Sequence, residues 1–195
     1  MSSGSITLPC LWAGSTYIST GARMGAIRLG GVWRDGYVFA EEYLSFAKFD
    51  FSELIALGLK AQHIQSAKLW FVAATTNKTN RVGLYQMLKA PVSGQFSWTQ
   101  ASNGGNWQTA GAKGSTDRGT YYAGPELPIG NTTHNIPLSG ADIIALQSGT
   151  QSIGFYTLDL GSQQFTAPYS EIQTFNVNIQ LSYRKSSLAG DVTMF

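Results

Sequence analysis

The sequence predicts an all-β fold, an antiparallel β-sandwich with one or two short helices. Many short apolar runs are separated by turns rich in glycine and proline, which is typical of all-β domains. The run 175–183 alternates strictly between apolar and polar residues, as expected for a strand with one buried face. Only the stretches 52–60 and 139–147 have helical patterns, and both are short. Together these features favour one sheet packed on another.

The segment 44–87 organises the predicted fold, because it holds three strand-like runs in succession. In its middle run, 64–72, successive residues alternate between two sets, as side chains do on a strand. The sets are Ala67, Leu69 and Phe71 on one side and Ser66, Lys68 and Trp70 on the other. We expect the rest of the chain to close over the first set, which leaves Trp70 facing away from the core.

The residues before this segment predict smaller elements. Met1–Leu8 is rich in serine and glycine, and we expect a loose arm there. The run 16–20 alternates and is the first strand candidate, followed by a short strand at 26–29. Asp35-Gly36 lies between apolar residues and signals a hairpin.

The residues after the segment contain the longest irregular stretch, 101–124, which is rich in glycine and aromatic residues. A loop of that length in a compact domain is usually functional or mobile. Ser139 and Asp142 form a capping pattern for the helix 139–147. A buried strand is expected at 153–158.

The chain is expected to divide into three parts. We predict an N-terminal arm at 1–15, a β-sandwich domain at 16–183 and a C-terminal tail at 184–195. The tail ends in apolar residues that have no place in the predicted strands. These residues, Val192, Met194 and Phe195, are candidates for binding a partner.

The composition limits the function. Charged residues make up 12% of the chain, about half the ~25% of ordinary domains. The net charge is +2 and no basic cluster is longer than Arg184-Lys185, so the basic stripe of a nucleic-acid-binding protein is missing. The polar surface must come from Gly, Ser, Thr, Asn and Gln, which suits neutral, hydrogen-bonding faces.

The sequence also bears on where the protein is made. The single Cys10 allows no internal disulfide, and we expect it to be a small, at least half-buried side chain; a reactive or intermolecular thiol is the alternative. The first residues do not form a signal peptide, and no run approaches the ~20 apolar residues of a membrane span. We therefore expect synthesis in a cytoplasm and no membrane partner.

Catalytic chemistry has little support. His63 and His134 lie in polar turns, where we expect surface or capping roles, and no zinc-binding pattern occurs. Asp117 and Glu126 flank the long loop and are the best candidates for the carboxylate pair of a glycosidase, but two loop acids are usually solvated charges. We predict a protein that is not an enzyme and has no cofactor and no metal.

Aromatic residues are the only enriched functional chemistry. Sugars bind by stacking on aromatic faces beside amide hydrogen-bonding groups, so exposed tryptophan and tyrosine mark possible glycan contacts. The candidates are Trp70, Trp107, Tyr121 and Tyr122. The alternative is that these residues pack, with Trp98 in the core and Trp70 beneath a neighbouring loop.

Several strands together resemble a known family. The matching runs are Phe46-Ala-Lys-Phe-Asp-Phe-Ser52, Ile64-Gln-Ser-Ala-Lys-Leu-Trp-Phe71, Gly154-Phe-Tyr-Thr-Leu158 and Val177-Asn-Ile-Gln-Leu-Ser-Tyr183. In their order they resemble the DNRLRE-type jelly-roll module, a family that includes alginate-binding carbohydrate modules. The resemblance spans about 16–183 and implies a jelly roll that faces carbohydrate. The motif that names the family has no counterpart here, so no calcium or sugar site is carried over.

The resemblance and the expected cytoplasmic synthesis lead to a hypothesis. A carbohydrate-facing module without an export signal fits a bacteriophage virion protein, assembled inside the host and displayed outside it. We expect a structural or attachment component, such as a head decoration, collar or tail-associated protein. Its partners would be other virion proteins and copies of itself, with a cell-surface polysaccharide as a possible ligand. The alternatives are a free-standing carbohydrate-binding module and, third, a small lyase or hydrolase.

Overall fold

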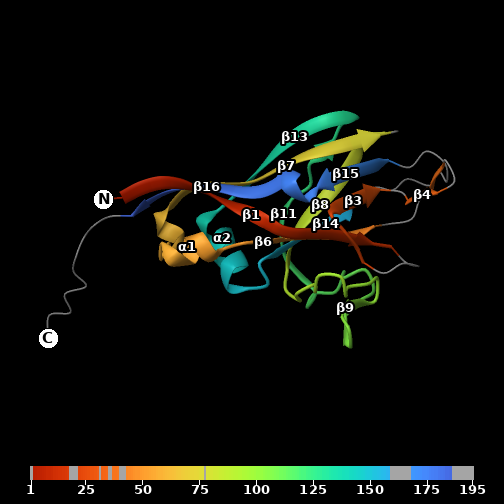
Figure 1. Ribbon diagram of the computed structural model, residues 1–195, viewed down its shortest axis with the longest axis horizontal. Helices are drawn as coiled ribbons and strands as arrows, with labels where there is room; N and C mark the ends of the chain where they lie inside the picture. Colours follow the sequence, from red (N-terminus) through yellow and green to blue (C-terminus); the bar gives the residue numbers. More distant parts are fainter. Residues whose placement is uncertain are drawn as a thin grey trace, which may run out of the picture.

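The computed structural model confirms the all-β prediction: antiparallel strands dominate, and the described residues form two short α-helices (Figure 1). It describes residues 2–17, 22–30, 32–34, 37–39, 43–76, 78–158 and 168–185. The strands form two layers that do not close into a barrel.

The first sheet has the order β1-β16-β7-β15-β3, with β13 on the other side of β7. Its members are β1 (Ser2–Thr16, first half), β16 (Val177–Lys185), β7 (Ile64–Thr76), β13 (Gly130–Leu138), β15 (Tyr169–Gln173) and β3 (Ala26–Gly30).

The second sheet continues from the other half of β1 in the order β1-β6-β14-β8-β11. Its members are β6 (Leu44–Phe49), β14 (Ser152–Thr157), β8 (Asn80–Met87) and β11 (Arg118–Ala123), with β2 (Arg23–Met24) and β12 (Glu126–Leu127) at its margins. Two small hairpins are β4 (Val32–Arg34) with β5 (Tyr37–Phe39), and β9 (Gln100–Ser102) with β10 (Gly105–Asn106). The β4–β5 hairpin corresponds to the hairpin predicted from Asp35-Gly36, and these two residues lie outside the described residues.

Strand β1 forms the corner between the sheets. Ser2–Pro9 pairs with β16, Cys10–Thr16 pairs with β6, and the register shifts between Cys10 and Trp12. Such a bulge bends a strand, which lets one strand serve two layers. The expected loose arm is therefore wrong over its described residues, Ser2–Leu8. Buried and exposed residues alternate along this part of the strand, and Ile6 and Leu8 are among the buried ones. The predicted domain boundaries as such stay a prediction.

The main core lies between the two sheets. Phe71 of β7 contacts Phe155 of β14 edge-to-face, with ring centroids 6.0 Å apart. The expected inward set on β7 is confirmed, since Leu69 and Phe71 are fully buried and Ala67 nearly so. Aromatic contacts of this kind add about 1 kcal/mol beyond their buried area.

A second core covers the outer face of the second sheet. Residues 88–117 fold back over β6, β14 and β8 and bury aromatic side chains against them. Phe46 lies 5.2 Å from Phe96 and 5.5 Å from Trp107, measured between ring centroids. The long loop predicted from its glycines is thus a packed cover. The cluster comprises Leu44, Phe46, Met87, Phe96, Ala101, Trp107, Ala112 and Tyr156.

The helices close one end of the sandwich, beside the start of β1 (Figure 1). Helix α2 (Gly140–Ser148) has the predicted capping box, in which Ser139 Oγ accepts from the Asp142 amide and Asp142 accepts from the Ser139 amide. Helix α1 (Ser52–Ala56) is shorter than expected, and its cap is Phe51. Two single turns, η1 (Ala61–His63) and η2 (Thr174–Asn176), precede β7 and β16.

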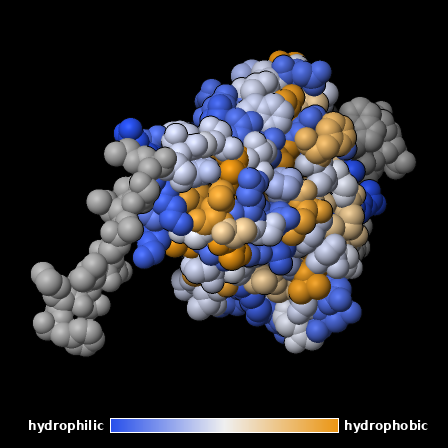
Figure 2. All heavy atoms as spheres, turned by 60° about the vertical axis from the view of Figure 1, so that its left-hand side comes forward, coloured by the Kyte–Doolittle hydropathy of each residue, from blue (hydrophilic) through white to orange (hydrophobic). Residues whose placement is uncertain are grey.

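The surface is mixed in hydropathy. On the face that Figure 2 shows, apolar and polar residues are interspersed in small patches, without one extended field of either kind. None of the helices in the described part of the chain is long and apolar enough to cross a membrane.

Candidate functional site

The outer face of the first sheet is mostly polar on β16 and on the first half of β7. On β16 and β7 the residues facing outward are those of polar parity, opposite the buried Leu69, Ile179 and Leu181. The strand registers bring these polar residues into rows across the sheet. The rows are Ser5–Ser182–Ser66, Thr7–Gln180–Lys68, and Pro9–Asn178–Trp70–Asn135. We call this surface the outer polar face.

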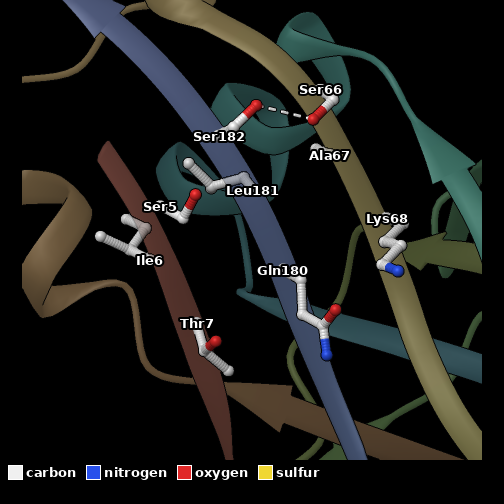
Figure 3. Close-up of a pocket in the computed structure, with 9 residues that line it drawn as sticks. All are labelled: Ser5, Ile6, Thr7, Ser66, Ala67, Lys68, Gln180, Leu181 and Ser182. Atoms are coloured by element: carbon white, nitrogen blue, oxygen red, sulfur yellow. Dashed lines mark hydrogen bonds between the residues drawn. The ribbon is translucent and has the colours of Figure 1, made fainter. Parts of the chain in front are cut away.

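One end of the outer polar face is hollowed (Figure 3). The hollow has a volume of about 300 Å³. Ser66 and Ser182 are hydrogen-bonded across β7 and β16, with their Oγ atoms 2.7 Å apart. Lys68 and Gln180 lie side by side on the same two strands. The lining residues are Ser5, Ile6, Thr7, Ser66, Ala67, Lys68, Gln180, Leu181 and Ser182.

A second hollow, of about 210 Å³, lies further along β7. Its acidic member, Glu171, accepts a hydrogen bond from Tyr169 Oη at 2.8 Å and forms an ion pair with Arg28 Nε at 3.3 Å. Arg28 Nη1 is buried without a hydrogen-bond partner in the described part of the chain. The carboxylate at this end of the face is therefore paired with a guanidinium. The lining residues are Val72, Ala74, Asn131, Glu171, Gln173 and Asn176.

Trp70 lies between the two hollows. Outward residues alternate along β7, so Lys68 borders the first hollow, Trp70 follows, and Val72 borders the second. The indole is half-buried and has an asparagine beside it on each neighbouring strand, Asn178 and Asn135. Asn178 Oδ1 is buried and has no hydrogen-bond partner among the described residues. An aromatic ring with amides on both sides, in a row of hydroxyls, offers the groups that sugars need.

The predicted residue Trp107 does not have an exposed ring. Its side chain is 5% exposed, packs on Phe46, and donates a hydrogen bond from Nε1 to the carbonyl of Ser97 at 3.0 Å. The expectation of exposure rested on its place in a glycine-rich loop. That loop folds over the second sheet and uses Trp107 to fill the space beneath it.

The other predicted aromatic residues are scattered. Tyr121 and Tyr122 are consecutive on β11 and so face opposite sides. Tyr121 is 50% exposed and packs beside Tyr85 with the rings tilted, their centroids 5.0 Å apart. Tyr122 packs against the main core, its hydroxyl is buried without a partner among the described residues, and burial raises its pKa. Neither residue is in the outer polar face with Trp70.

The terminal candidates Val192, Met194 and Phe195 lie outside the described residues. Their proposed role in binding a partner stays a prediction.

The candidate acids also lie in different settings. Asp117 is 0% exposed and accepts hydrogen bonds from the backbone amides of Gln108, Thr109 and Gly114 at 2.8–3.1 Å. Glu126 is exposed on β12. Asp117 therefore clamps the loop that covers the second sheet, which is a structural use of a carboxylate.

The histidines have local partners. His63 Nδ1 accepts a hydrogen bond from the Lys60 amide at 3.0 Å, the capping role expected for it. His134 stacks on Phe71 at 5.0 Å between ring centroids, and burial lowers its pKa. Among the described residues no group of three or more His, Cys, Asp or Glu side chains could hold a metal ion. Cys10 is half-buried, and burial raises its pKa to about 12, so the thiol stays protonated at neutral pH.

The sequence contained a signal for the residues it did not single out. Asn178, Gln180 and Ser182 form the polar parity of 175–183, and Ser66 and Lys68 share the parity of Trp70. What the sequence does not contain is the pairing of these two runs as neighbours, which brings both polar parities onto one face.

Comparisons with known proteins do not identify a relative. No family model matches the chain, and no curated protein matches it. The resemblance to the DNRLRE-type jelly-roll module therefore stays a prediction.

Proposed function

We propose that the protein recognises a carbohydrate through the outer polar face and performs no reaction on it. One observation carries this proposal: Trp70 is half-buried between Asn135 and Asn178, on a face rich in hydroxyl and amide side chains. The ring can stack on a sugar while the amides bind its hydroxyl groups. Such a face binds neutral or weakly charged polymers, which agrees with the low charge of the chain.

The test is binding of the purified protein to a panel of bacterial and algal polysaccharides, measured by calorimetry. We expect micromolar, competable binding that falls at least tenfold in Trp70→Ala. Tyr121→Ala is the matched control, because Tyr121 is an exposed aromatic residue on the second sheet. Equal losses in both variants, or no binding by the unmodified protein, would refute the proposal.

A second proposal is that the protein is a structural component of a bacteriophage virion. Its support is a pair of exposed apolar side chains, Phe175 at 79% and Leu11 at 55% exposure, on η2 and β1, two elements that lie next to each other in the fold. Docking of another protein over these two residues would remove their apolar surface from water. Incorporation of Phe175→Ser and Leu11→Ser variants into particles tests it: normal incorporation of both would count against docking at this place.

A further inference from the structure

The free edge of β13 has unusual properties for a strand at the margin of a sheet. It is nine residues long, pairs in unbroken register with β7 on one side, and forms the upper margin of the molecule in Figure 1. Among the described residues none pairs with its other side. Unpaired backbone groups along such an edge favour the addition of another strand.

Proteins usually protect such edges with charges, and β13 has none. Residues 130–138 contain no Lys, Arg, Asp or Glu. Two other edge strands, β3 and β11, differ: β3 is short and contains Arg28, and β11 has shifts in register and contains Arg118. Only Pro137, near one end, limits pairing along β13. The edge of β13 therefore lacks the charges that usually prevent an edge strand from pairing with another strand.

We propose that two copies of this protein pair through β13, antiparallel, about a two-fold axis at His134. Position 134 is the centre of the strand, so this register pairs all nine residues. It sets Thr133 opposite Asn135 of the other copy, and Thr132 opposite Ile136. Residues of one parity meet residues of the same parity, so outward side chains stay outward in both copies, as a sheet with one buried face requires.

A second copy is the occupant that the strand fits best, because the strand complements itself. Two uncharged edges meet without repulsion, and hydroxyl and amide side chains oppose each other across the axis. An isologous contact of this kind closes after two copies, so it does not lead to fibres.

The dimer would join two ligand-binding faces into one. A two-fold axis perpendicular to the sheet keeps the outer polar faces of both copies on the same side. The two Trp70 side chains would then be separated by three strand spacings, about 14 Å at ~4.8 Å each. A polymer could contact both, and its avidity would exceed the affinity of one copy. Pairing itself does not depend on the proposed carbohydrate binding.

The first experiment is sedimentation of the full chain over a range of concentrations. We expect a mass of twice 21.0 kDa for the unmodified protein. Thr133→Lys should give a monomer, because it puts two like charges close to the axis. Thr120→Lys makes the same change on the β11 edge and should leave the dimer intact. A monomer at all concentrations, or a dimer broken only by Thr120→Lys, would overturn the proposal.

A cross-link tests the register. In a Cys10→Ser background, His134→Cys places two thiols opposite each other on the axis, where antiparallel pairs have Cα atoms about 4.5–5.5 Å apart, within reach of a disulfide. Oxidation should convert this variant to a covalent dimer, while Thr120→Cys stays monomeric under denaturing conditions. If His134→Cys does not cross-link although the protein is dimeric, pairing is not centred at 134. If the protein is a monomer and still binds carbohydrate, the proposed dimer is refuted and the proposed function is supported.

Discussion

The outer face of the second sheet is covered by the chain, whereas the described residues leave the outer face of the first sheet uncovered. On the second sheet, residues 88–117 cover the face and build an aromatic core with Phe46, Trp107 and Tyr156. On the first sheet, Trp70 stands in a row of polar residues, and the described residues form no such cover. Tryptophan is therefore a structural residue on the second sheet, and on the first sheet it is available to a ligand. A tryptophan's function depends on what the chain places above it.

The difference follows from the parities of the strands. In β6, β14 and β8 both parities contain buried apolar residues, so each strand needs cover on two sides. In β7 and β16 one parity is polar, and a second cover would bury unpaired hydroxyl and amide groups at a cost. The chain places its long loop over the sheet that needs it.

The largest expected effect is the loss of a ring from the covered face. Trp107→Ala should lower the free energy of unfolding by about 4 kcal/mol, because it removes a buried indole and leaves a cavity. Trp70→Ala, on the uncovered face, should cost about 1 kcal/mol, the scale of a cross-strand contact. Chemical denaturation measures both. Similar costs for the two would contradict the division between a structural and an available tryptophan.

The next effect concerns the clamp on the covering loop. Asp117→Ala should lower the free energy of unfolding by about 3 kcal/mol, because three backbone amides lose a charged acceptor inside the protein. Glu126→Ala removes an exposed acid close in sequence and should change stability little. If Asp117→Ala were as stable as the unmodified protein, the clamp would not hold the loop.

The sequence predicted the fold better than the site, and the reason is physical. Periodicity reports burial along one strand, so β7, β16 and helix α2 could be expected from their own residues. Trp70 was placed outward by the same parity argument. Trp107 depends on where a distant loop folds, and no local pattern encodes that.

The N-terminal segment shows a second kind of error, in which a predicted loose arm is a strand. Ser2–Pro9 has a composition typical of disorder, yet its pairing with β16 makes it the strand that joins both sheets. Pairing with a strand more than 160 residues away overrides local propensity. The rows of the outer polar face depend on the same long-range register, which is why their members could not be grouped in advance.

A smaller effect tests how the two layers of the covered face are joined. Tyr156 Oη donates a hydrogen bond to the carbonyl of Ala112 at 2.9 Å, which ties β14 to the covering loop. Tyr156→Phe should cost about 1 kcal/mol, because the ring stays and only the hydrogen bond is lost. On the uncovered face, Ser182→Ala breaks the exposed bond to Ser66 and should cost less than half of that. Thermal unfolding of the pair compares a bond beneath a cover with one open to water.

The smallest effect is a pH dependence at the edge of the first sheet. Burial against Phe71 lowers the pKa of His134 below its usual value, so the unfolded chain binds a proton more readily than the folded chain. Stability should therefore be full above about pH 6.5, the ordinary histidine pKa, and fall as the pH drops toward the depressed value. Denaturation of dilute protein at pH 7.5 and 5.5 measures the fall, and His134→Gln should reduce it. If the stability of His134→Gln falls as much as that of the unmodified protein, other groups cause the loss of stability at low pH. His134 would then be as accessible to water as the residues of the outer polar face.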